Sequence, residues 1–199
     1  MKKLLIFTII ICSALLLEAR VMGQFGLGLD LNGKQSFSNV ALSRDSKVNT
    51  GVSLYAEVLS AERVGPGDML FGLGLEFQVP RELKSKNLDL NTRKFSYLPI
   101  YLTGKYVLTP ILLSPEVIVQ AGYNLPAYSD NYAHSAVNNL KVSGGFYWGM
   151  GFGVGFKPIV LQAMYKSSQN TFSWKDIDAQ NLETSSTNSQ LSLQLGLRF

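Results

Sequence analysis

The last ten residues, Gln190 to Phe199, alternate without a break between apolar and hydrophilic or small side chains. Successive side chains of a β-strand point to opposite faces, so this segment predicts a strand with one wholly apolar face. That face holds Leu191, Leu193, Leu195, Leu197 and Phe199. Such a strand either buries its leucines in a soluble core or turns them toward lipid in the wall of a membrane barrel.

Seven earlier segments repeat this period of two. With the last one, the predicted strands cover residues 24–32, 50–59, 69–79, 95–108, 116–125, 145–156, 159–166 and 190–199. Most reach the roughly 9–11 residues that a tilted membrane strand needs. The connections alternate between long (33–49, 80–94, 126–144, 167–188) and short (60–68, 109–115, 157–158). This asymmetry is typical of an up-and-down barrel with long outer loops and short periplasmic turns.

The terminal Phe199 and the segment from Phe95 to Tyr106 carry a family resemblance. The chain resembles the small bacterial outer-membrane β-barrels of the OmpX and OmpA-transmembrane-domain type. The resemblance implies an all-β fold, an eight-stranded antiparallel up-and-down transmembrane β-barrel in the bacterial outer membrane. It also implies that Phe199 is an assembly signal, through which the last strand engages the barrel-assembly machinery, and that outer-membrane lipid surrounds the barrel.

The first 23 residues read as a secretory signal peptide, which leaves residues 24–199 as the barrel domain. Lys2 and Lys3 precede an apolar run, and Gly23 ends a plausible cleavage site. Cys12, the only cysteine, is interpreted as an apolar residue of that run rather than a lipidation site. The full chain has a formal charge of +4. Removing the signal leaves a nearly neutral domain, which gives no support to nucleic-acid binding.

The hydrophilic phase of the predicted strands contains charged residues that an eight-stranded lumen would enclose. They are Asp30, Glu57, Glu76, Lys105, Glu116, Lys166 and Arg198. Buried charges must be paired, so we expect ion pairs, with Lys105 bound to Glu116 and Arg198 to Glu57. The narrow interior favours a structural plug over a gated pore.

The positions of the aromatic residues also fit a membrane wall. Aromatic residues of the apolar phase gather toward the two ends of the strands, as in the girdles at membrane–water interfaces. The periplasmic group is Phe25, Phe71, Tyr106, Phe156 and Phe199; the outer group is Phe77, Tyr123, Phe146, Trp148 and Tyr165.

Pro99 lies inside a predicted strand and deletes one ladder hydrogen bond, so we expect a bulge or irregularity there.

Motifs of catalysis and metal binding are weak. Gly28 to Lys34 has the opening spacing of a phosphate-binding loop, but Gln35 stands where Ser or Thr is required. His134, the only histidine, lies in a predicted outer loop without an ordered Ser–His spacing. The Lys175–Asp178 segment lacks the remaining ligands of a calcium loop. We therefore expect neither an enzyme nor a cofactor or metal site.

The expected role is that of an integral envelope protein with a plugged polar lumen. Its long outer loops hold aromatic residues and are expected to serve structure, adhesion or the binding of a host or surface ligand. Three alternatives remain: a narrow porin-like channel, a lipid-modifying enzyme that depends on His134, and a secreted soluble barrel with its leucines inside around an apolar ligand.

Overall fold

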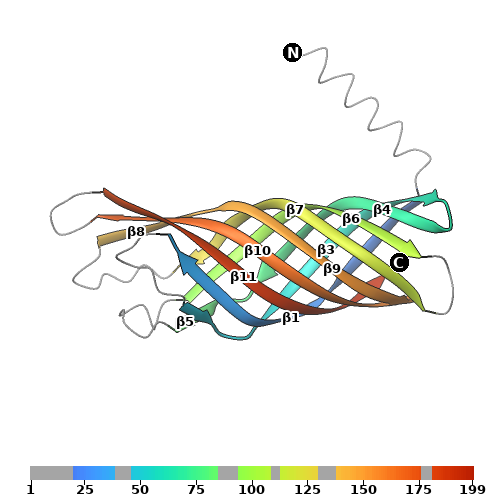
Figure 1. The fold of residues 1–199 in the computed structure, drawn as a ribbon, viewed down its shortest axis with the longest axis horizontal. Coiled ribbons are helices and arrows are strands. Elements are labelled where there is room, and N and C mark those ends of the chain that lie inside the picture. Colours follow the sequence, from blue (N-terminus) through green and yellow to red (C-terminus); the bar gives the residue numbers. More distant parts are fainter. Residues whose placement is uncertain (1–19, 39–45, 85–93, 109–112, 130–137, 176–180) are drawn as a thin grey trace, which may run out of the picture.

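The eight long strands of the predicted barrel are present and closed. The structure is a computed structural model that describes residues 20–38, 46–84, 94–108, 113–129, 138–175 and 181–199. The long strands are β1 (Arg20–Phe37), β3 (Gly51–Val64), β4 (Gly67–Gln78), β6 (Lys94–Leu108), β7 (Ser114–Ser129), β9 (Gly145–Phe156), β10 (Ile159–Lys175) and β11 (Asn181–Arg198). Each pairs antiparallel with the next, and β11 pairs with β1 (Figure 1). The predicted all-β, eight-stranded antiparallel fold is confirmed.

None of the described segments is a helix of the length and apolarity that crossing a membrane would require.

The predicted outer loops contain more strand than expected. Three short strands, β2 (Ser46–Val48), β5 (Arg81–Lys84) and β8 (Asn138–Ser143), lie in segments that were predicted as connections. At the outer end β2 takes the place of β3 beside β1, β5 pairs with β2 and β6, and β8 replaces β9 beside β10. In the same region β10 and β11 remain paired out to Lys175 and Asn181. We call β2, β5, β8, residues 33–37, 167–175 and 181–189 the outer extension.

The connection between β3 and β4 is shorter than the predicted segment 60–68. The two strands pair as far as Val64 and Gly67, which leaves only Gly65 and Pro66 as the turn. Gly65 has a φ of +60°, the value that a type II′ hairpin turn requires at its first central position. The predicted strand was too short because its apolar alternation stops before Ser60. The strand continues through Ser60 and Glu62, whose polar side chains lie outside the membrane core.

Pro99 lies at the break in the ladder that its missing N–H predicted. The β4–β6 pairing ends at Leu75 and Ile100, next to Pro99, whereas on the β7 side Pro99 still faces Asn124. A register shift follows between Ser96 and Tyr97. The Ser96 hydroxyl donates to the Gln78 carbonyl, so a side chain replaces one of the lost backbone contacts.

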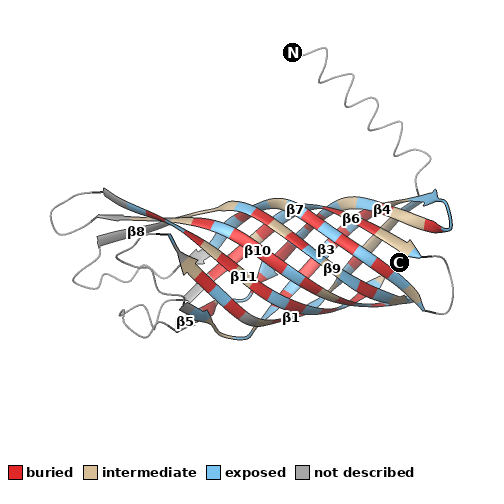
Figure 2. Cartoon of the chain, viewed as in Figure 1, coloured by how far each residue is buried: buried red, intermediate tan, exposed pale blue. Residues whose placement is uncertain are grey.

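Buried and exposed residues alternate along the strands of the barrel (Figure 2), and the polarity of the two faces is inverted relative to a soluble protein. Leu102 and Phe152 are 65% and 70% exposed on the outer wall, whereas Asp30, Glu76 and Lys105 are 0% exposed. Exposed apolar area is unfavourable in water by roughly 25 cal/mol per Å². The soluble alternative, with the leucines enclosed, is therefore wrong.

The exposed apolar residues form a continuous belt, which we call the apolar band. It comprises Phe25, Leu27, Leu29, Val52, Leu54, Val58, Phe71, Leu73, Leu75, Phe77, Ile100, Leu102, Val117, Val119, Tyr123, Phe146, Met150, Phe152, Val154, Leu161, Tyr165, Leu191, Leu193, Leu195 and Leu197. Aromatic rings pair on this belt: Phe25 and Phe199 have ring centroids 5.8 Å apart, and Trp148 and Tyr165 are 5.6 Å apart. Aromatic residues with one apolar and one wet side suit the membrane–water interface.

A polar lumen as the candidate functional site

All seven charged residues expected in the lumen lie there. Six of them are at most 4% exposed, and the Arg198 side chain is 12% exposed. They separate into an inner cluster of Glu57, Lys105, Glu116 and Arg198, and an outer cluster that contains Asp30, Glu76 and Lys166.

The inner cluster forms two ion pairs, but with partners exchanged relative to the prediction. Lys105 binds Glu57, and the Arg198 Nη2 lies 2.7 Å from the Glu116 Oε2. The expected pairs Lys105–Glu116 and Arg198–Glu57 are therefore wrong.

The register explains the exchange. Lys105 faces Ile118 on β7, so Glu116 is displaced by two residues along the neighbouring strand. Gln24 lies in register between Arg198 and Glu57 and keeps the two apart. Its Oε1 accepts hydrogen bonds from the Arg198 Nε at 2.8 Å and from the Lys105 Nζ at 3.1 Å. Adjacency of strands alone did not give the position of each side chain along the barrel axis.

Neutral side chains complete the inner cluster. The Glu57 Oε1 accepts from the Tyr101 hydroxyl and from the Gln120 Nε2, both at 3.3 Å. The Glu116 Oε1 accepts from the Gln162 Nε2 at 2.6 Å. A buried ion pair is tolerated only when its remaining hydrogen-bonding capacity is used, and here both carboxylates have a cation and a neutral donor.

The outer cluster includes Arg81, a residue that the sequence analysis placed in an outer loop. Arg81 extends from β5 into the lumen, where its Nη2 lies 2.7 Å from the Asp30 Oδ2. It also donates to the Oε1 atoms of Gln190 at 2.9 Å and Gln78 at 3.2 Å. A signal for it was present: the predicted lumen held four acids and only three bases, so one cation was missing.

Lys166 occupies the centre of the outer cluster. Its Nζ lies 2.5 Å from the Glu76 Oε2, 3.1 Å from the Ser192 Oγ and 3.8 Å from the Asp30 Oδ1. Gln78 and Gln194 donate to the two Glu76 oxygens at 3.2 and 3.4 Å. With Arg81 included, each cluster holds two acids and two bases, so the charges named here balance.

Tyrosine rings separate the clusters. Tyr101 and Tyr147 are each 1% exposed and have ring centroids 5.6 Å apart. The Tyr147 hydroxyl donates to the Gln120 Oε1 at 2.9 Å. A gap remains among Gln78, Tyr147 and Lys166, but no part of it admits a water-sized sphere.

The periplasmic end of the lumen is apolar, which the sequence analysis did not foresee. Four side chains near the short turns are at most 2% exposed: Leu59, Leu70, Ile118 and Val160. They share the strand phase that carries the charged residues. The lumen therefore combines an apolar layer with two neutral ion-pair clusters and a tyrosine layer.

Among the described residues, no group of three or more His, Cys, Asp or Glu could hold a metal ion. His134 and Asp178 lie outside the described residues. Phe199 is 73% exposed, and its backbone N–H and carbonyl bond to Gly23 at 3.0 and 2.9 Å.

Two solved structures are similar to this chain over most of its length. The attachment invasion locus protein Ail of Yersinia pestis is 15% identical, with a TM-score of 0.46 over 92% of this chain and 99% of that one. The outer membrane protease OmpT of Escherichia coli is 7% identical, with a TM-score of 0.49 over 92% and 96%. No protein-family model and no curated protein sequence matches the chain.

The geometry of the chain itself decides its class. A closed wall of eight antiparallel strands satisfies the backbone without free edges, and the exterior is apolar where the interior is charged. Only a bilayer solvates such a surface favourably. The fold is that of a small eight-stranded outer-membrane β-barrel, and the apolar band places it in the outer membrane.

Proposed function

We propose that this protein is a sealed, non-enzymatic outer-membrane barrel that acts through the surface of its outer extension. The observation that carries this proposal is the filled lumen. Five ion pairs, a tyrosine layer and a periplasmic apolar layer of the described residues occupy the interior. An eight-stranded barrel leaves just enough room for side chains, so a filled interior supports a structural plug.

The ion pairs support sealing because they join distant parts of the wall. Arg198 on β11 and Glu116 on β7 are separated by two strands, and Lys166 and Glu76 lie on opposite walls. Opening a continuous path would separate these pairs in a low-dielectric interior, which is costly for each buried charge.

The outer extension supports a role in surface binding. Its outward face carries in-register rows of uncharged hydroxyl groups: Ser185 pairs with Thr171, which pairs with Ser143, and the Ser38 N–H bonds to the Ser185 carbonyl. Inside, the Gln35 amide donates to the Ser186 hydroxyl at 3.1 Å, and the Asn124 amide donates to Asn170 at 2.9 Å. A paired sheet with polar groups on both sides presents a rigid, hydrated surface beyond the membrane.

Planar-bilayer recordings test the seal. Refolded wild-type protein that shows the mobility shift of a heat-sensitive barrel on SDS gels is expected to give no unitary current steps. Reproducible steps that change in size with Glu76→Gln or Arg198→Gln would instead establish a channel and overturn the proposal.

Shortening the outer extension tests the surface role. Gln169 and Thr187 face each other in register, so an Asn-Gly turn replacing residues 170–186 closes a shorter hairpin. Cells displaying this variant should adhere less to cultured epithelial layers and abiotic surfaces than cells with the wild type, at equal amounts of folded barrel. Lys157→Gln, at the periplasmic turn, is the matched control. Equal adhesion of all three strains would contradict the proposal.

A further inference from the structure

The outward face of the outer extension carries uncharged hydrogen-bonding side chains in register. Ser143 of β8, Thr171 of β10 and Ser185 of β11 form one row across three strands. Gln169 and Thr187 form the next row, two residues nearer the membrane. Ser185 and Gln169 are exposed and the other three are half-buried, so all five are open to solvent. We call these five residues the neutral strip.

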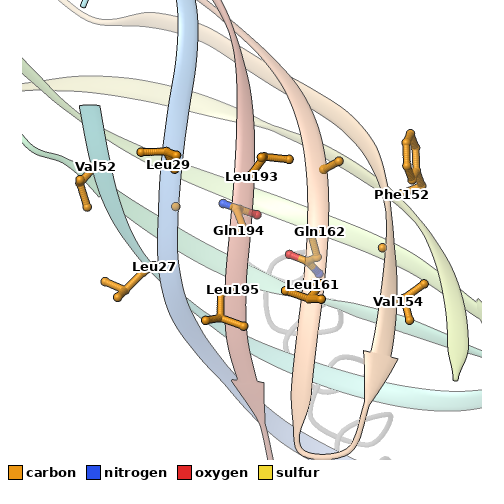
Figure 3. Close-up of a pocket in the computed structure, with 13 residues that line it drawn as sticks. Leu27, Leu29, Val52, Phe152, Val154, Leu161, Gln162, Leu193, Gln194 and Leu195 are labelled. Atoms are coloured by element: carbon orange, nitrogen blue, oxygen red, sulfur yellow. The ribbon is translucent and has the colours of Figure 1, made fainter. Parts of the chain in front are cut away.

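An apolar groove on the same wall shows where the hydrocarbon region ends. The groove has a volume of about 640 Å³ and crosses β9, β10, β11, β1 and β3 (Figure 3). On β10 it is lined by Ala163, which is followed outward by Tyr165, 43% exposed, and then by Ser167. The outward face therefore changes from apolar to hydroxyl-bearing within four residues. Gln169 and Thr171 of the neutral strip lie beyond that change, outside the hydrocarbon.

A tryptophan lies at the membrane-facing edge of the neutral strip. Trp148 of β9 is in register with Ser167 of β10, whose hydroxyl lies 3.2 Å from the Ser189 hydroxyl on β11. The half-buried Trp148 ring packs against Tyr165 with a centroid distance of 5.6 Å and an interplanar angle of 51°. The face of an aromatic ring is partly negative, so it attracts weakly positive C–H groups. The indole thus adds an apolar contact beside the hydroxyl groups.

The charge of the neutral strip limits the partner that it fits. None of its five side chains is ionisable. Glu183 on β11 and Lys34 on β1 border this part of the wall, and each of them already interacts with another group. An ionised partner would lose hydration at the strip without meeting a counter-charge there. Charge complementarity therefore favours an uncharged partner.

The residue types of the neutral strip favour a sugar over a protein. Serine is depleted in protein interfaces, where aromatic residues and Arg are enriched. Four of the five strip residues carry a hydroxyl, which both donates and accepts hydrogen bonds. Their side chains are short and their strands are paired, so binding orders little additional structure. A neutral oligosaccharide offers closely spaced hydroxyl groups to the strip and C–H faces to the indole.

We propose that the neutral strip binds the uncharged oligosaccharide of a surface outside the cell. Sugar hydroxyl groups bond to Thr171, Ser185 and Thr187, and a sugar ring stacks on Trp148. Neighbouring groups in a row are about 4.8 Å apart and the rows are about 6.8 Å apart, so one oligosaccharide contacts several of them. The inference rests on the proposed surface role and names the partner for it.

A printed array of neutral, sialylated and sulfated oligosaccharides tests this partner. The probe is the full barrel in phosphatidylcholine vesicles without glycolipid, first shown to be folded by its heat-dependent gel shift. The barrel should bind neutral oligosaccharides equally well at low and high salt, because no ion pair contributes to binding. Binding of sialylated or sulfated oligosaccharides alone, or of none, would overturn the proposal.

Surface plasmon resonance with the neutral oligosaccharide that binds best measures single groups. Thr187→Val keeps the shape of the side chain but removes its hydroxyl, and should weaken binding about fivefold. Trp148→Leu should weaken it by about the same factor. The matched controls are the exposed Thr50→Val, outside the strip, and Phe77→Leu, an exposed aromatic on the opposite wall. Both should bind like the wild type.

Equal losses in the strip variants and their controls would contradict the sugar site. A loss with Lys34→Gln as large as that with Thr187→Val would also overturn it, by assigning the binding to charge. The adhesion test separates this inference from the proposed function. If the shortened hairpin lowers adhesion but no neutral oligosaccharide binds, the surface role stands and the sugar partner is wrong. If neutral oligosaccharides bind and adhesion is unchanged, the inference stands and the adhesive role is wrong.

Discussion

Lys166 and Glu76 project from opposite walls of the barrel and meet inside it, with the Lys166 Nζ 2.5 Å from the Glu76 Oε2. Three strands separate β10 from β4 in either direction around the closed sheet. This ion pair therefore links two opposite walls of the barrel. The Lys166 Nζ also lies 3.8 Å from the Asp30 Oδ1. The ion pair couples the two halves of the wall, which the backbone ladder joins only through intervening strands.

Neutralising Lys166 and neutralising Glu76 should destabilise the barrel to different extents. Lys166→Met leaves Glu76 buried without its cation and should lower the free energy of unfolding by about 3–5 kcal/mol. Glu76→Gln should cost less, because Asp30 still faces Lys166. The double variant should be no worse than Lys166→Met alone. Urea unfolding in lipid vesicles, followed by tryptophan fluorescence, measures this cycle, and strictly additive losses would show that the pair is not coupled.

Arg81 and Gly51 form a second testable relationship at the outer end of the lumen. A Cβ atom built on Gly51 would collide with the Arg81 side chain at its Cδ and Nε. Gly51→Ala should therefore displace Arg81 from Asp30 and destabilise the barrel by about 1–3 kcal/mol. In an Arg81→Ala background the same change should become neutral or stabilise by about 0.5 kcal/mol, because only the chain-entropy gain remains.

Gly155 provides the control for that sign change. The nearest atom to a Cβ built there is 3.7 Å away, so Gly155→Ala should behave alike in both backgrounds. The readout is the midpoint of urea unfolding for all six proteins, namely the two backgrounds and each glycine variant in both. A Gly51→Ala penalty that persists without Arg81 would mean that the backbone, rather than this guanidinium, requires glycine.

The alternation of apolar and polar side chains was sufficient to predict the barrel. Shifting the register of a strand by one residue would turn all of its charged side chains toward lipid, so the alternation determines which face is inside. Leu191 to Leu197 and Gln190 to Arg198 therefore fall on the expected faces. Partner choice was not predictable in the same way, since Lys105 reaches Glu57 across β4 and its position along the axis depends on shear and tilt.

The strands of the outer extension were not predicted, for a different reason. Arg81 and Lys34 lie where the apolar signal has ended, so neither phase identifies the inner face. The bulge after Leu31 reverses the phase of β1, and only the register with β11 shows it. Polar strands beyond a membrane look like loops in sequence because both of their faces are wet.

The mature N-terminus should be Gln24, as the signal-peptide pattern predicts. Arg20 to Gly23 pair with β3 in the full chain, and Gly23 forms two backbone hydrogen bonds with Phe199. Cleavage before Gln24 would remove these contacts, including both backbone hydrogen bonds between Gly23 and Phe199. N-terminal sequencing of the protein from the outer-membrane fraction decides the matter, and a sequence starting at or before Arg20 would contradict the predicted cleavage site.

Substitutions of Phe199 and Phe25 can distinguish an effect on the stability of the barrel from an effect on its assembly in cells. Its ring is 73% exposed and meets Phe25 edge-on, with ring centroids 5.8 Å apart and planes at 65°. Such a pair contributes about 0.5–1.5 kcal/mol, so Phe199→Ala and Phe25→Ala should each destabilise the refolded barrel by similar, small amounts. In cells the two should differ if the terminal ring is an assembly signal: Phe199→Ala should reduce the heat-modifiable barrel in the outer membrane several-fold, whereas Phe25→Ala should leave it close to wild type. Equal yields of the two variants would assign Phe199 to the ring pair alone, because both changes remove the same contact and only one alters the last residue of the chain.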